Sequence, residues 1–232
     1  MKLIIDDKVR DVGVRVGIGV VLNVDNRNYP QELIQYFNEV IKNIRKSYSL
    51  DALKDDPVIR AYRDFYWRVL GIDPTKQRPS QEALIRRVLR GEELPKINPI
   101  VDIGNIVSIK YMVPIGIYDI DKIGNVDLIL RYAREGEEFY PIGSGKKVLK
   151  SNQIILATSD DRVIHVYPYR DSELTKVTED TRNILIVSAG VPGVDVERLT
   201  GSVHEIEDLT IKYLNGNVLK YSSIVSTYME LL

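Results

Sequence analysis

The second half of the chain constrains the fold most, because it consists of short β-branched runs separated by turn-forming residues. The runs "VDLILRYA", "QIILATSD", "VIHVYPYR" and "NILIVSAG" are rich in Val, Ile and Tyr, and Gly, Asn, Asp and Ser residues lie between them. Such runs are typical of strands. An earlier run, "VGVRVGIGVVLNV", has the same character, and its glycines allow close backbone approach. These runs predict a sheet.

Four other segments show helical periodicity instead. In residues 29–48, the apolar residues Leu33, Phe37, Ile41 and Ile44 recur at helical spacing. The other three segments are residues 55–72, 80–91 and 195–214. Asp55 or Asp56 is expected to cap the second of these helices, and Ser80 the third. The order of segments predicts a single compact α+β domain over residues 1–232, in which helices flank a mixed, mostly antiparallel sheet.

Composition excludes several classes of function. Lys and Arg number 32 against 33 Asp and Glu, so nucleic acid would have to bind through a local basic patch. The chain has no cysteine and only two isolated histidines, so we expect no metal and no cofactor. Asp6 and Asp7 interrupt the apolar N-terminus, and no apolar run is long enough to span a membrane. These features predict a cytoplasmic protein without a membrane partner.

Two polar residues interrupt the apolar stretch "PIVDIGNIVSIKYMVPIGIYD" at residues 99–119, namely Asp102 and Asn105. A buried polar group without a partner costs about 1–3 kcal/mol. We expect the segment around them to be a strand that Asp102 pins by accepting backbone N–H groups. Asn105 either braces a turn or binds a ligand carbonyl, and the ligand is the hypothesis we prefer.

Residues 78–123, "RPSQEALIRRVLRGEELPKINPIVDIGNIVSIKYMVPIGIYDIDKI", carry a resemblance to a known family. It continues through "REGEEFYPIGSGKKV" (134–148) and "YRDSELTKVTEDTRNILIV" (169–187). Together these segments resemble the B3/B4 editing domain of the phenylalanyl-tRNA synthetase beta subunit, and free-standing relatives of that domain most of all. The resemblance covers about residues 60–215, and residues 1–60 add a strand and a helix at the N-terminus.

The resemblance implies a cleft that admits an aminoacyl group on a tRNA end. The synthetase domain removes tyrosine wrongly esterified to the phenylalanine tRNA. This chain has Gly104-Asn105 where the synthetase usually has Thr-Asn, and Pro114-Ile115-Gly116 where it has Pro-Leu-His. We expect both glycines to enlarge the pocket. The segment "SAGVPGVD" offers no direct equivalent of the synthetase's tyrosine-selecting carboxylate, so Asp195 or Glu197 would replace it only by a shift.

Several residues are therefore candidates for binding the substrate, while no catalytic residue is assigned. Ester hydrolysis needs only an oriented water and dipoles near the developing oxyanion, which glycine backbone and amides can supply. The substrate-binding candidates are Gly104, Asn105, Ser108, Gly116, Tyr118, Gly143 and Ser144. Arg78, Arg86 and Arg87 either contact tRNA phosphates or form a solvated helix face.

Two functions follow from these residues. The first is a trans-editing hydrolase whose partner is an aminoacyl-tRNA or the tRNA acceptor end. The alternative is a non-catalytic module that kept the cleft and binds a tRNA end or a free amino acid. DNA is not an expected partner of either.

Overall fold

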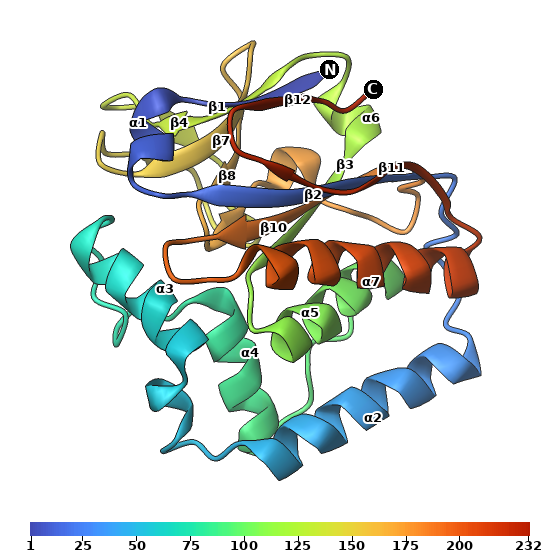
Figure 1. Ribbon diagram of the computed structural model, residues 1–232. Coiled ribbons are helices and arrows are strands. Elements are labelled where there is room, and N and C mark those ends of the chain that lie inside the picture. Colours follow the sequence, from blue (N-terminus) through green and yellow to red (C-terminus); the bar gives the residue numbers. More distant parts are fainter.

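Two β-sheets stack on one another in the computed structural model, which describes residues 1–232, and the longer helices cover one side of the stack (Figure 1). The four-stranded sheet has the order β11-β2-β10-β3, and the six-stranded sheet has the order β12-β1-β4-β7-β8-β9. A separate pair joins β5 and β6. Only the pairing of β1 with β4 is parallel. The predicted α+β class with mostly antiparallel sheets is therefore confirmed.

The elements have the following bounds. The helices are α1 (Asp7–Asp11), α2 (Gln31–Ser47), α3 (Pro57–Arg68), α4 (Ser80–Leu89), α5 (Pro99–Tyr111), α6 (Ile120–Ile123) and α7 (Val196–Leu214), with short 3₁₀ turns at Leu53–Asp55 and Glu173–Thr175. The strands are β1 (Lys2–Ile5), β2 (Arg15–Leu22), β3 (Ile115–Asp119), β4 (Leu128–Tyr132), β5 (Glu138–Phe139), β6 (Lys147–Val148), β7 (Ile154–Thr158), β8 (Val163–Val166), β9 (Arg170–Asp171), β10 (Ile184–Gly190), β11 (Asn217–Val225) and β12 (Tyr228–Glu230).

Strand β10 shows how the layers are held together. Successive side chains of a strand point to opposite faces. Leu185 and Val187 pack into the core between the two sheets, whereas Ile184 and Ile186 pack against α5 and α7. Because both faces are covered, every residue of β10 is buried, and the sequence "ILIVSAG" is almost continuously apolar.

The helices α2 and α4 form an outer layer that packs against α5 (Figure 1). Helix α3 lies beside them and inserts Tyr62 and Phe65 into the core between the sheets. Of the two predicted caps of α3, Asp56 is the one that caps it, since its Oδ1 accepts the amide of Val58 at 2.9 Å. Ser80 does not cap α4. Pro79 occupies the cap position in an extended conformation, and Ser80 is the first helical residue.

Helix α5 corrects the prediction of a strand at Val101–Asn105. Asn98 caps this helix by accepting the amide of Val101 at 3.1 Å, and Pro99 occupies its first turn. The helix packs against α2, α4, α7 and β3, so most of its residues are buried. A helix covered on all sides is apolar all round and loses its sequence periodicity, so the run read equally well as a strand.

Candidate functional site

A cavity of about 440 Å³ lies between the first half of α5 and the edge strand β3. We call it the α5–β3 cavity. The opposite wall comes from Ile142 and from the chain between Asp171 and Glu179. The complete lining is Ile97, Asn98, Val101, Gly104, Asn105, Ile115, Ile117, Ile142, Asp171, Lys176, Val177, Thr178 and Glu179. It combines an apolar wall with a few polar groups, which is the usual character of small-ligand sites.

Asn105 is the candidate that the structure places most directly in this cavity. Its half-buried side chain lines the α5–β3 cavity, and its amide makes no hydrogen bond to another residue. Asn105 also lines a second cavity of about 520 Å³, between α2, α5 and residues 91–96. An amide with free donor and acceptor capacity at the meeting point of two cavities is available to a ligand.

Asp102, one helical turn earlier, has a structural role. It is 7% exposed, and its Oδ1 accepts the backbone amide of Ile97 at 3.0 Å. Its Oδ2 accepts the hydroxyl of Tyr29 at 2.7 Å. Burial raises the pKa of Asp102 despite these two donors. The expected burial and backbone hydrogen bond are confirmed, although the residue pins a helix N-terminus and not a strand.

Asp171, which the sequence reasoning missed, supplies a carboxylate to the α5–β3 cavity. Its Oδ1 accepts the hydroxyl of Tyr118 at 2.9 Å and lies 2.8 Å from Nδ1 of His165. Tyr118 and His165 are buried, whereas the Asp171 side chain remains 34% exposed. The two buried partners thus hold a carboxylate that faces the cavity. The sequence did contain one signal for this residue. Asp171 is the only carboxylate in "YRDS" (169–172), which begins a segment of the family resemblance.

Tyr118 reaches the cavity only through Asp171. Its ring is fully buried in the core, and burial next to the Asp171 carboxylate raises the pKa of its hydroxyl well above the ordinary value. The hydroxyl therefore stays protonated and donates to Asp171. Asp195 and Glu197, the alternative carboxylates, are exposed residues that do not line this cavity.

The two glycines do not enlarge the pocket as expected. A Cβ on Gly116 would lie 2.6 Å from Cζ of Tyr118, so the tyrosine ring occupies the space beside this glycine. A Cβ on Gly104 would lie 2.8 Å from Cδ1 of Ile117. Gly104 lines the cavity, whereas Gly116 is buried and does not. Neighbouring side chains of β3 therefore fill the room that the missing side chains leave.

The remaining substrate-binding candidates lie elsewhere. Ser108 is buried and donates to the carbonyl of Val113 at 2.7 Å, which closes the end of α5. Gly143 and Ser144 are exposed in the turn after Ile142, and Ser144 lines a neighbouring cavity of about 390 Å³. Arg78 lines the same cavity, which we call the Arg78 cavity.

The arginines of α4 are engaged within the protein. Nε of Arg86 lies 2.8 Å from the buried carboxylate of Glu82. Arg87 donates to the carbonyl of Glu93 at 2.6 Å and pairs with Glu92 at 3.4 Å. Of the three candidates for tRNA contact, only Arg78 has no ion pair.

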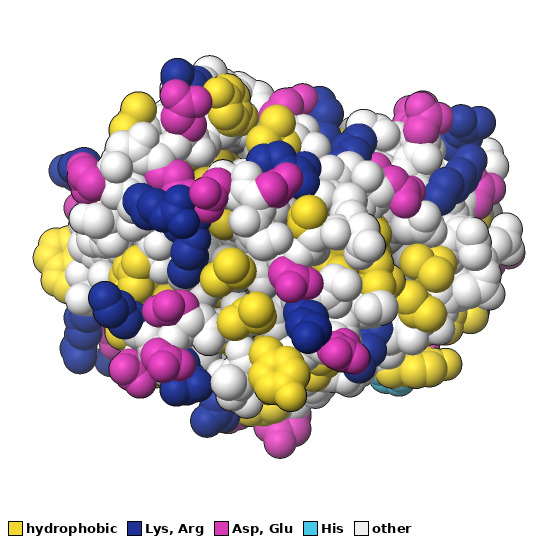
Figure 2. Space-filling model, turned by 90° about the horizontal axis from the view of Figure 1, so that it is seen from above, with side chains coloured by type: hydrophobic (Ala, Val, Ile, Leu, Met, Phe, Trp, Pro, Cys, Tyr) yellow, Lys and Arg dark blue, Asp and Glu magenta, His cyan; other side chains and the backbone are white.

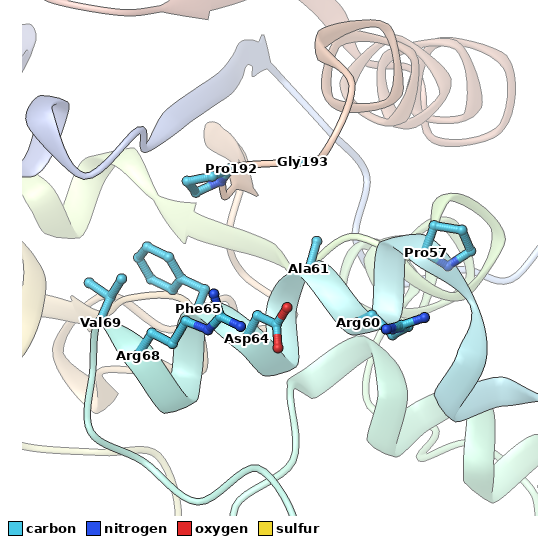
Figure 3. Close-up of a pocket in the computed structure, with 9 residues that line it drawn as sticks. All are labelled: Pro57, Arg60, Ala61, Asp64, Phe65, Arg68, Val69, Pro192 and Gly193. Carbon is cyan, nitrogen blue, oxygen red and sulfur yellow. The ribbon is translucent and has the colours of Figure 1, made fainter.

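A further cavity of about 560 Å³ holds none of the predicted site residues. Figure 3 shows it between α3 and the Pro192–Gly193 turn after β10, with Phe65 and Val69 on the side of Pro192. Asp64 lies between Arg60 and Arg68 along the helix, so the cavity presents charges of both signs. No group of three or more potential metal ligands occurs in the protein. None of its helices is both long and apolar enough to cross a membrane.

Comparison with known proteins identifies the fold. A sequence model of the B3/4 domain family matches residues 61–212, which is most of the chain. The chain belongs to the B3/4 domain family. This B3/4 domain is 32% identical over 138 residues to the phenylalanine–tRNA ligase beta subunit of Staphylococcus saprophyticus, covering 60% of the chain and 17% of the relative.

A longer match joins this B3/4 domain to the beta subunit of Fusobacterium nucleatum, with 27% identity over 220 residues, 84% of the chain and 23% of the relative. The chain thus spans less than a quarter of these curated relatives. Among solved structures, an N-terminal fragment of the phenylalanyl-tRNA synthetase beta subunit from Pyrococcus horikoshii has the same fold. The TM-score is 0.50 at 17% identity, over 93% of this chain and 49% of that one.

Proposed function

We propose that the α5–β3 cavity binds the aminoacyl group of an acylated tRNA end and that the protein hydrolyses the ester. One observation carries the proposal: a cavity of this B3/4 domain is lined by two polar groups that are available to a ligand. Asp171 presents a carboxylate and Asn105 presents an unpaired amide, on opposite walls. A family resemblance alone would not support a site, because one fold hosts many functions.

The two groups suit the two ends of an aminoacyl ester. The Asp171 carboxylate is the natural acceptor for the α-ammonium group, since charge-assisted hydrogen bonds are about twice as strong as neutral ones. The Asn105 amide is the natural donor to the ester carbonyl. The apolar wall formed by Ile115 and Ile117 takes the amino-acid side chain.

Hydrolysis then requires a water molecule and no protein nucleophile. The water oxygen bonds to the acyl carbon, the bond from that carbon to the ribose oxygen breaks, and a proton passes from the water to the ribose oxygen. The Asn105 amide stabilises the negative charge that develops on the carbonyl oxygen. His165 and Tyr118 act as positioning residues, because their contacts with Oδ1 of Asp171 orient the carboxylate.

The test is deacylation of a panel of misacylated tRNAs. Loss of one oxyanion donor typically costs 10²–10³ in rate, so Asn105→Ala should lower the rate by about 100-fold. Asp171→Asn should lower kcat/KM for deacylation by about 10–100-fold, because it removes the charged acceptor of the ammonium group. Asp180→Asn is the matched control, since Asp180 is an exposed carboxylate near the same segment that does not line the cavity.

The alternative is a binding module without catalysis. It is favoured by one observation: Gly104 and Gly116 stand where the synthetase domain usually has the Thr and His of its pocket. This alternative predicts that acylated tRNA binds, that Asp171→Asn weakens the binding, and that no tRNA of the panel loses its amino acid faster than in buffer. That last result would exclude the hydrolase.

A further inference from the structure

The Arg78 cavity differs from the three cavities described above in the charge of its lining. Three cationic side chains line it, those of Arg78, Lys147 and Arg170, and no carboxylate does. Each of the other three cavities described above contains at least one Asp or Glu. In a protein of net charge −1, three cations around one concave space form a local positive field. The face in Figure 2 illustrates the contrast, because there acidic and basic side chains are interspersed.

The cations of the Arg78 cavity are free to bind an anion. Arg78 and Lys147 pair with no carboxylate of the protein. Arg170 is held in place through its Nη2, which donates to the carbonyl of Ile142 at 2.8 Å, and it also pairs with no carboxylate. Ser144 and Gln77 add neutral hydrogen-bonding groups to the lining. Guanidinium forks, an ammonium group and hydroxyl or amide donors are the groups that recognise phosphate.

The Arg78 cavity and the α5–β3 cavity share a wall. Arg170 and Asp171 are consecutive residues of β9, and successive side chains of a strand point in opposite directions. Arg170 lines the Arg78 cavity, whereas Asp171 lines the α5–β3 cavity. Ile142, whose carbonyl binds Arg170, also lines the α5–β3 cavity. One strand therefore separates a cationic site from the proposed acyl site.

We propose that the Arg78 cavity binds a phosphate group, and that in the acylated RNA this is the phosphate beside the terminal ribose. The ester joins the acyl group to that ribose, so its nearest phosphate lies one sugar away from the acyl group. The identity of the phosphate as part of an RNA rests on the proposed function, whereas phosphate binding itself does not. The three cations of this site supply the local positive charge for binding RNA phosphate, which the net charge of −1 does not supply.

Binding of a short single-stranded RNA without an acyl group tests the proposal, by fluorescence anisotropy over a range of salt concentrations. Lys147→Ala should weaken binding about fivefold, as expected for an exposed ion pair at the upper end of its range. A plot of log affinity against log salt has a negative slope, and Lys147→Ala should make it shallower by about 0.7, the value for one phosphate contact to a single strand. Lys150→Ala is the matched control, because Lys150 is another exposed lysine nearby that does not line the cavity. It should change neither quantity.

A parallel titration with inorganic phosphate distinguishes the two sources of phosphate. If inorganic phosphate binds with the same dependence on Lys147 while RNA does not, the phosphate site stands and RNA is excluded as its source. If Lys147→Ala and Lys150→Ala weaken both ligands equally, or if neither ligand binds, the phosphate site is refuted. Because neither probe carries an acyl group, these outcomes do not depend on hydrolysis. A protein that binds the RNA through Lys147 but hydrolyses no ester would refute only the hydrolase.

Discussion

Gly116→Ala tests whether Tyr118 occupies the space beside this glycine. The added methyl group would lie 2.6 Å from Cζ of Tyr118, far inside the normal contact distance, and Tyr118 is fully buried. Overpacking of this kind costs about 1–3 kcal/mol. The backbone of Gly116 does not have a positive φ, so alanine also reduces the entropy of the unfolded chain and returns about 0.4–1 kcal/mol. The expected net loss in the free energy of unfolding is about 1–2 kcal/mol.

Urea denaturation followed by circular dichroism measures this loss, and thermal melting should show it as a fall in Tm of about 2–8 °C. Gly145→Ala is the control, because no atom lies within 4 Å of a Cβ at that position and its φ is not positive. Its stability should remain within about 0.5 kcal/mol of the parent. In a double-mutant cycle, Gly116→Ala should cost less in a Tyr118→Leu background, since the shorter side chain relieves the overlap. If Gly116→Ala is as stable as Gly145→Ala, Tyr118 does not fill this space.

Two further changes test other contacts of the site and its scaffold. Burial raises the pKa of Asp102 in the folded protein, so its charged form is disfavoured there and the free energy of unfolding should fall as pH rises through and above the ordinary carboxyl pKa. Asp102→Asn should make this fall smaller in a series of denaturation curves from pH 4 to pH 7, because the contribution of Asp102 is lost, and a slope equal to that of the parent would contradict the assignment. Arg86→Ala should cost about 2 kcal/mol because it takes a charge-assisted partner from the buried Glu82, whereas Arg87→Ala, 47% exposed, should stay within about 0.5 kcal/mol. Equal losses in the two variants would show that Arg86 is not part of the scaffold.

The sequence by itself determined the elements whose signals are local. The helices α2, α3 and α7 follow from apolar spacing and from caps such as Asp56, and the strands β7, β8 and β10 follow from β-branched runs between turn residues. These signals involve residues close together in the chain, so no knowledge of the fold is needed to read them. The burial of Asp102 was predictable for the same reason, because its apolar neighbours already place it in the interior.

Only the tertiary structure decided the conformation of residues 99–111 and the composition of the site. An apolar run without periodicity suits a buried strand or a buried helix, and packing against α2, α4, α7 and β3 selects the helix. Tyr118, His165 and Asp171 come from three different strands, and nothing local indicates that their side chains meet. Gly116 makes room for the ring of Tyr118, which lies two positions later in β3 and folds back over the glycine, and not for a ligand. Contacts between distant residues depend on how the strands are paired and layered, and the local pattern of residues along the sequence does not indicate that pairing.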